Sequence, residues 1–413
     1  MASLAPAPAV PFRQDASIIA IVGFAHGTSH FFHLMLPPLF PFFMGEFGIG
    51  FTEAGLLMTI FFLVSGIGQA IAGIWVDRYG APRVLVAGMA LLSLSGVLVA
   101  VAPSMSGLML AAFVAGLGNS VFHPADFALL NKRVSMPRLG HAFSTHGLSG
   151  NLGWALAPVL MVATATAYGW RTAGWVAAAV GALALAVLIS QRALLRYEAA
   201  ESQATKLPLG ARASLGDVLR SPVVLGAFAF FFFITFGFGA LQNFAPSILR
   251  ELFSLSLGAA TSALSVYLVA SAGGLVLGGF LAKPTNQHER LVALSIGAGA
   301  LIALLIAWLP LPSFVVLPMM ALMGFTLGIA GPSRDLLVRT ATKARLGESA
   351  FGRVYGIVYS GLDAGLALAP IAFGLLLDNH LHRYVFVGIA ISLVVAIGAA
   401  AFVAKVARDP ITR

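Results

Sequence analysis

The chain alternates between long apolar segments and short polar connections. Six apolar segments, each of about 20 residues or more as a bilayer crossing requires, occupy roughly 17–44, 51–76, 84–102, 106–131, 140–166 and 170–191. After a polar stretch, six more occupy roughly 221–250, 258–282, 290–309, 313–338, 352–377 and 383–405. This pattern predicts an all-α membrane protein with twelve transmembrane helices in two six-helix bundles.

The polar stretches divide the chain into five expected parts. These are a cytoplasmic tail at 1–16, an N-terminal bundle at 17–191, a cytoplasmic central loop at 192–220, a C-terminal bundle at 221–405 and a cytoplasmic tail at 406–413. Residues 1–15 are rich in Ala and Pro and lack the basic-then-apolar layout of a removable signal. We therefore expect the first apolar segment to remain as a helix.

The orientation follows from the distribution of Lys and Arg, which favour the cytoplasmic side of a membrane protein. If the N-terminus is inside, twenty of the 24 basic residues fall in inner loops and tails. Only Arg171, Arg250 and Arg383 fall outside, and Arg334 lies within a helix. Both termini are therefore expected in the cytoplasm, and the chain is expected to be a multi-pass protein of the inner membrane.

The two halves repeat in sequence. GLGNSVFHP ends at Pro124 and GFTLGIAGP ends at Pro332, an offset of 208, while GNLGWALAPVL and LDAGLALAPIA place Pro158 and Pro370 at an offset of 212. Several landmarks in the same order at nearly one offset indicate an internal duplication, which many transporter folds contain. The repeat predicts pseudo-symmetric halves.

Composition and charge narrow the function. Hydrophobic residues make up 59% of the 413 positions and charged residues 9%, whereas a soluble domain has roughly 45–50% and about 25%, so a water-soluble fold is excluded. The chain has no cysteine, which excludes disulfides, thiolate metal sites and cysteine nucleophiles. The net charge of +9 is accounted for by the Lys and Arg residues of the inner loops, which set the orientation in the membrane. No nucleic-acid partner is therefore expected.

A specific motif lies between the second and third apolar segments. The run Gly73-Ile-Trp-Val-Asp77-Arg78-Tyr-Gly80-Ala-Pro-Arg83 closely resembles the G-x-x-x-D-R-x-G-x-x-R loop of the major facilitator superfamily. Glycines allow a tight inner turn, the acid is placed to bind a neighbouring helix terminus, and the arginines remain at the interface. The resemblance implies the major facilitator fold and transport by alternating access. In the second half, Lys283 stands where Asp77 would fall.

Within that superfamily, mainly the first half resembles the fosmidomycin resistance protein branch of drug exporters. The resemblance rests on the histidine-rich first segment, on Phe122-His123-Pro124 and on Gly150-Asn151-Leu152-Gly153. It implies proton-coupled export of a small, often anionic, drug-like compound.

Ionisable residues inside membrane spans are costly and are therefore the best functional candidates. The offset of 208 makes Asp126 equivalent to Arg334. By resemblance, their two helices line the central cavity, so we expect a salt bridge that closes an inner gate and that protonation of Asp126 would break. Alternatively, both side chains reach the interface, or Arg334 pairs with Asp335 or Asp77.

Asp363 replaces the Asn151 of the other half within a helix of small residues. It is a candidate proton carrier, with a hydrogen-bonded packing residue or a cation contact as alternatives. Gln242 and Asn243, at the outer end of the seventh span, are candidate substrate contacts, although a structural role fits them equally well.

His26, His30 and His33 are spaced i, i+4 and i+7 and therefore share one helix face. That face fits a soft-metal site, a proton relay, a hydrogen-bonding surface for an anion, or structural histidines. His123 is a further candidate for the cavity. On balance, no metal or other cofactor is expected.

We therefore expect a monomeric secondary transporter, not an enzyme, whose partners are a small-molecule substrate, protons and the lipid bilayer. A proton gradient would supply the energy, because no G-x-x-x-x-G-K nucleotide motif is present. Proton-coupled export of an anionic or drug-like solute is the leading hypothesis. The alternatives are uptake of a small carboxylate, metal or metal chelate, and, more remotely, a histidine-ligated membrane metalloenzyme.

Overall fold

The structure is a computed structural model that describes residues 11–196, 220–282, 287–346 and 351–408. Twelve spans in these ranges are long and apolar enough to cross a membrane, which confirms the predicted helix count. The predicted tails 1–16 and 406–413 and the central loop 192–220 lie partly outside the described residues, and the five boundaries stay predictions.

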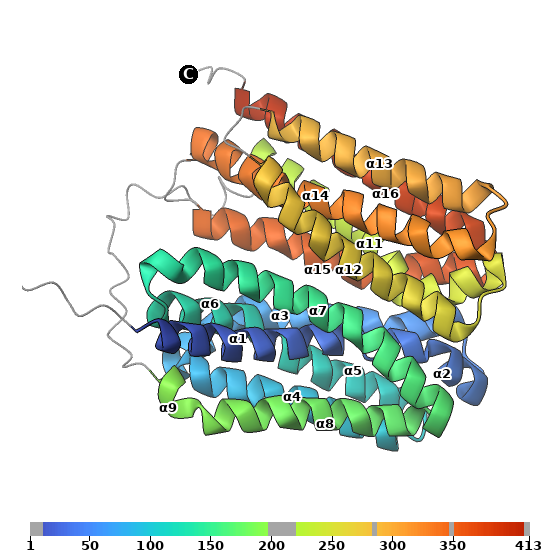
Figure 1. Cartoon of the computed structure of the whole chain (residues 1–413), viewed down its shortest axis with the longest axis horizontal. Coiled ribbons are helices and arrows are strands. Elements are labelled where there is room, and N and C mark those ends of the chain that lie inside the picture. The colour runs from blue at the N-terminus through green and yellow to red at the C-terminus, as the bar shows by residue number, and fades with distance from the viewer. Residues whose placement is uncertain (1–10, 197–219, 283–286, 347–350, 409–413) are drawn as a thin grey trace, which may run out of the picture.

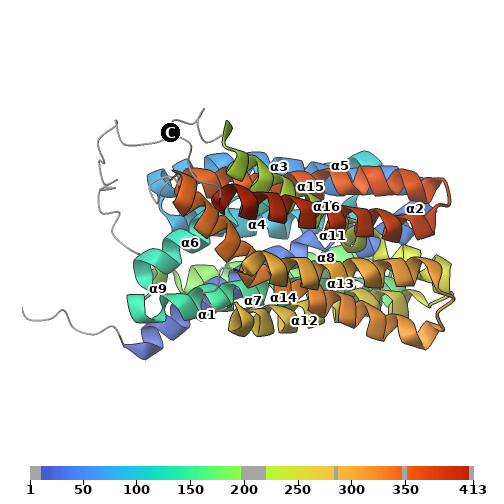
Figure 2. The same ribbon diagram turned by 90° about the horizontal axis from the view of Figure 1, so that it is seen from above.

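The helices form two bundles that lie side by side along a common long axis (Figures 1 and 2). The first bundle consists of α1 (Phe12–His33), η1 (Pro37–Leu39), α2 (Phe40–Phe47), α3 (Phe51–Tyr79), α4 (Ala81–Val101), α5 (Met105–Asn119), α6 (Phe122–Arg133), α7 (Met136–Tyr168), α8 (Trp170–Ser190) and α9 (Arg192–Leu195). The second consists of α11 (Pro222–Phe253), α12 (Leu257–Leu281), α13 (His288–Trp308), α14 (Ser313–Leu346), α15 (Phe351–Asp378) and α16 (His382–Arg408).

The described chain begins and ends at the same end of the molecule, where α1 starts and α16 stops (Figure 1). We call this the terminal end and the opposite end the far end. Which of the two faces the cytoplasm stays a prediction.

Local chemistry sets the helix boundaries. α3 ends at Gly80, whose φ of +83° suits glycine best, and α4 then starts with Pro82 in its first turn. Gly169, with φ +85°, separates α7 from α8 in the same way. At the far end, Ser256 caps α12 by accepting a hydrogen bond from the Ala259 amide at 3.2 Å.

The fourth span contains a break that the apolar pattern did not predict. The expected continuous segment 106–131 is two helices, α5 and α6, separated by Ser120 and Val121. Pro124 has no N–H to donate to the carbonyl of Ser120, so the i to i−4 bond of a continuous helix is missing there. The first span is likewise broken between His33 and Pro37.

Close packing within the first bundle depends on small residues where α1 crosses α7. A Cβ placed on Gly153 would overlap the Gly27 carbonyl oxygen and lie 3.1 Å from the Phe31 amide nitrogen. Gly147, two turns earlier on the same helix, has nothing within 4 Å of that position.

We expect Gly153→Ala to lower the stability of the purified protein by about 1–3 kcal/mol, because overpacking forces the two backbones apart. Gly147→Ala is the matched control and should unfold at or slightly above the wild-type temperature. Thermal unfolding in detergent measures both variants. Equal melting temperatures for the two variants would contradict the predicted close contact.

Candidate functional site

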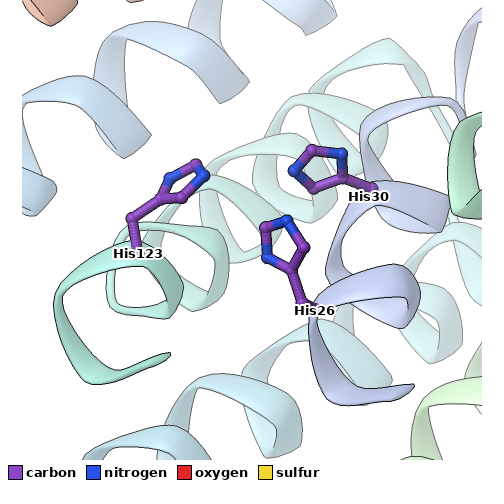
Figure 3. Close-up of side chains that lie close together, drawn as sticks. All are labelled: His26, His30 and His123. Carbon is purple, nitrogen blue, oxygen red and sulfur yellow. The ribbon is translucent and has the colours of Figure 1, made fainter. Parts of the chain in front are cut away.

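Five histidines gather in the interior of the first bundle. The α1 histidines predicted to share one face, His26, His30 and His33, are 2%, 8% and 6% exposed. His123 joins them from α6 and His146 from α7, with ring centroids 5.3 Å and 3.5 Å from that of His26. Figure 3 shows the rings of His26, His30 and His123 turned toward one another. The predicted face is thus one wall of a three-helix cluster.

Asp126 is the acid of this cluster and is completely buried. His146 Nε2 donates a hydrogen bond to Asp126 Oδ2 at 3.1 Å. His26 Nδ1 lies 3.2 Å from the same oxygen, although this contact is not aligned as a hydrogen bond. One carboxylate oxygen therefore faces two imidazoles from two helices.

Neutral amides hold the other two cluster members in place. His33 Nε2 donates to Asn119 Oδ1 at 2.8 Å, and Asn119 Nδ2 donates to Ser65 Oγ at 2.8 Å. His123 Nδ1 donates to Gln69 Oε1 at 3.0 Å. Both ring nitrogens of His30, by contrast, are buried without a hydrogen-bond partner. His33 and His123 are therefore held by hydrogen bonds to amide side chains, whereas His30 has none.

The predicted ion pair between Asp126 and Arg334 is not formed in this conformation; because the pair is expected only when the inner gate is closed, it stays a prediction for that state. Asp126 contacts His26 and His146, while Arg334 Nε donates to Asp335 Oδ1 at 2.9 Å. Asp126 follows the interruption between α5 and α6, whereas α14 is continuous through Arg334. The local pairing with Asp335 was one of the alternatives.

A cavity of about 320 Å³ lies where the two bundles meet. Asn151 and Trp154 of α7 line it from the first bundle, and the second bundle contributes Phe238, Tyr267 and Arg334 together with apolar side chains. The Arg334 guanidinium lies 4.8 Å from the centre of the Phe231 ring, and the Trp154 indole N–H has no acceptor. A mostly apolar cavity with one cation and one free donor suits an amphipathic anion.

Trp154 joins this cavity to the histidine cluster. The His30 ring stacks on the indole with centroids 4.4 Å apart, and Phe238 of α11 lies 5.5 Å from the same indole. A change at the cluster can therefore reach the cavity through one aromatic side chain.

Gln242 and Asn243 do not line this cavity. Each is 1% exposed, near the far end of α11. Asn243 Nδ2 donates to Gly239 of its own helix at 2.7 Å, and neither amide atom of Gln242 has a partner. Their proposed contact with substrate stays a prediction for a conformation that is open at the far end.

The two bundles make close contacts along a seam between α3 and α15, in the far half of the molecule. Asp378 Oδ1 and Oδ2 accept hydrogen bonds from the Phe51 and Thr52 amides at 2.6 and 3.0 Å. Further along the seam, Thr59 Oγ1 donates to the Ala367 carbonyl at 2.7 Å. The carboxylate of one bundle thus caps the N-terminus of a helix in the other.

Asp363 lies where this seam ends, near the middle of α15. A Cβ on Gly66 would be 3.0 Å from the Asp363 Cβ, whereas one on Gly73, two turns closer to the terminal end, would have nothing within 4 Å. Within the described ranges, Asp363 has no recorded hydrogen bond or ion pair. The candidate proton carrier therefore lies about one helical turn beyond the seam hydrogen bond at Ala367.

In the motif between α3 and α4, the turn at Gly80 has the expected geometry, but Asp77 does not make the expected contact. Gly80 adopts the positive φ that the tight turn requires. Asp77, Arg78 and Arg83 are exposed. Among the described residues Asp77 has no hydrogen bond or ion pair, so its expected binding to a helix terminus is not seen in this conformation.

Sequence reasoning missed Gln69, Trp154 and Asp378 as parts of these sites. Gln69 was detectable as an amide inside an apolar span. Trp154 and Asp378 had no local signal, because their importance comes from partners more than 80 residues away.

Comparisons with known proteins agree on the family. The model of the Major Facilitator Superfamily matches residues 19–348. The fosmidomycin resistance protein of Escherichia coli (strain K12) is 30% identical over 271 residues, which span 65% of each chain. A probable 4-methylmuconolactone transporter of Cupriavidus pinatubonensis is 28% identical over 313 residues, spanning 71% of this chain and 67% of that protein.

A solved structure shares the fold. It is a bacterial homologue of the human lysosomal transporter Spinster, in an inward-facing and occupied conformation, and it superposes with a TM-score of 0.71 at 14% identity, covering 97% of this chain and 98% of that one. Together with the family match and the twelve spans, this identifies the chain as a member of the major facilitator superfamily, whose members are transporters and not enzymes.

Proposed function

We propose that this transporter exports a small amphipathic organic anion in exchange for protons, by alternating access of the cavity between the two bundles. The observation that carries the proposal is Arg334, a cation that is one-quarter exposed on the wall of an otherwise mostly apolar cavity. Solvent screens such a part-buried arginine only in part, so it can attract an anion although it also pairs with Asp335. The fosmidomycin resistance relative supports export of a drug-like solute.

The seam supports the direction in which the cavity opens. Its contacts lie in the far half, and Gly73 has open space beside it toward the terminal end. We infer that the cavity opens toward the terminal end, and we place that end in the cytoplasm of an inner-membrane protein because of its excess of Lys and Arg. Substrate enters there and leaves once the seam has opened.

Asp363 is the proposed proton site. The helices packed against its turn present Gly66 from α3 and Phe232 and Thr235 from α11, none of them charged. A charged carboxylate is costly at that depth, and a protonated one packs more easily against Gly66. Proton binding would thus stabilise the closed seam, and proton release would favour its opening.

The first prediction concerns Arg334. Small aromatic and aliphatic carboxylates and phosphonates should raise the melting temperature of the wild-type protein, because a ligand bound only by the folded state stabilises it. Arg334→Gln should abolish this shift, whereas Arg339→Gln, an exposed arginine on the same helix, should retain it. Stabilisation by neutral or cationic compounds that persists in Arg334→Gln would refute an anion site.

The second prediction concerns Asp363. In proteoliposomes, an imposed pH gradient should drive accumulation of a stabilising anion by the wild type. Asp363→Asn should lose this pH-driven accumulation while retaining exchange of labelled for unlabelled substrate, because the cavity is unchanged. Glu251→Gln, an exposed acid near the far end, serves as the control. Undiminished pH-driven accumulation in Asp363→Asn would exclude Asp363 as the proton site.

The third prediction concerns Asp378, whose removal should weaken the closed seam. The chain has no cysteine, so Gln242→Cys provides a single buried thiol as a reporter. Asp378→Ala should increase labelling of this thiol by a polar maleimide roughly 2- to 30-fold, the range expected from loss of a helix cap. Asn379→Ala, which removes only a hydrogen bond to Leu375 of α15, should leave the labelling rate unchanged. A labelling rate in Asp378→Ala equal to that of the Gln242→Cys parent would show that Asp378 does not hold the seam closed.

A further inference from the structure

We propose that His26, His30 and His123 form a binding site for a divalent transition-metal ion of the Zn²⁺ class, inside the first bundle. Each residue offers one ligand nitrogen, and these nitrogens all lie within 4.8 Å of one another. Two residues come from α1 and one from α6, and Figure 3 shows the three rings facing a common centre.

The neighbours of two of these histidines leave the correct nitrogens available. A metal-binding imidazole usually donates its other N–H to a carboxylate or carbonyl oxygen, which fixes its tautomer. His123 Nδ1 donates to Gln69 Oε1 at 3.0 Å, and His26 Nδ1 faces Asp126 Oδ2 at 3.2 Å. The Gln69 oxygen fixes Nδ1 of His123 as the donor, so Nε2 of that ring keeps its lone pair for a metal. The Asp126 carboxylate favours the same tautomer of His26 electrostatically, although that contact is not aligned as a hydrogen bond.

His30 supplies the independent observation that points to a ligand. Both of its ring nitrogens are buried without a hydrogen-bond partner, and a neutral imidazole left in that state is energetically unfavourable. A bound cation would satisfy the nitrogen that carries the lone pair, while the other nitrogen keeps its N–H. Of the three proposed ligands, only His30 has both ring nitrogens buried without a partner.

Gly150 provides the space for this arrangement. A Cβ at that position would lie 2.7 Å from His30 Nδ1 and 3.0 Å from His26 Nε2, so a larger residue would displace both rings. Zn–N bonds of about 2.0–2.1 Å in a tetrahedral site require nitrogens about 3.3–3.4 Å apart. The rings must therefore move inward by roughly 1 Å on binding, which side-chain rotation can provide.

The donor set defines the class of ion. Three imidazoles suit Zn²⁺, Cu²⁺, Ni²⁺ and Co²⁺, whereas Mg²⁺ and Ca²⁺ prefer oxygen ligands. The buried carboxylate of Asp126 offsets part of the ionic charge from behind His26. The fourth coordination position remains open for water.

The position of the three ligands means that the ion would stabilise the first bundle alone. All three ligands belong to the first bundle, so the ion pins α1 to α6 and does not bridge the two halves. It therefore leaves their relative motion free. It also fixes the ring of His30, which stacks on Trp154 in the wall of the cavity.

The test is stoichiometric metal binding to the full chain, purified with a tag that lacks histidine and stripped with a chelator. Dialysis against Co²⁺ should give one ion per protein and the visible d–d bands of a nitrogen-bound Co²⁺ ion, which excess Zn²⁺ should bleach. His30→Ala and His123→Ala should lose the bound ion. Gln69→Ala, which removes only the supporting acceptor, should bind it about 10- to 100-fold more weakly.

His33→Ala is the matched control, because His33 lies on the same face of α1 but outside the triad. It should retain one ion per protein. Size-exclusion profiles and metal-free melting temperatures identify variants that have not folded. If His123→Ala does not fold, His123→Gln replaces it. Substoichiometric Co²⁺ in the wild type, or equal binding in the wild type, His30→Ala and His123→Ala, would overturn the proposal.

A second set of groups near the triad gives the rival outcome. His26, Asp126 and His146 also place one ligand atom each within 4.8 Å of the others. In our assignment, Asp126 supports His26 from behind and His146 is not a ligand, so His146→Ala should still bind the ion. Loss of binding in His146→Ala with retention in His123→Ala would move the ion to the rival set and refute the site proposed here.

Discussion

The contact between α3 and α15 is the constraint on which the rest of this structure depends. Asp378 caps α3 across the bundle interface, and Thr59 bonds to the Ala367 carbonyl further along. Each bundle packs internally as a unit, so the position of the seam decides where the halves diverge and thus where the cavity opens. Because the exposed carboxylate of Asp378 accepts two amides at the start of α3, these hydrogen bonds are lost when that helix end moves away.

The two bundles repeat in sequence, but they carry different functional side chains. The first contains the five-histidine cluster and Asp126, while the second contributes Arg334 and most of the cavity lining. Trp154 is the physical link, since it stacks on His30 and faces Phe238. Substrate recognition and the histidine cluster are therefore separate sites that one side chain can couple.

The sequence predicted what depends on local pattern. Twelve apolar spans and the turn at Gly80 follow from hydrophobic length and glycine geometry, and both are confirmed. Span length alone did not locate the interruption at Ser120, although Asn119 and Pro124 on either side of it favour one. The expected pair of Asp126 and Arg334 stays a prediction for the state in which the inner gate is closed, since in this conformation each residue has partners within its own bundle. The capping role of Asp378 could not be predicted, because it depends on a contact more than 300 residues away.

Paired distance measurements between spin labels test alternating access most directly. In this cysteine-free chain, Glu53→Cys with Asn379→Cys reports on the far end, and Asp77→Cys with Arg339→Cys on the terminal end; all four positions are exposed. Moving from acidic to alkaline pH in the presence of a stabilising anion should lengthen the far-end distance and shorten the terminal-end distance. Distances that stay fixed, or that change in the same direction at both ends, would contradict the account.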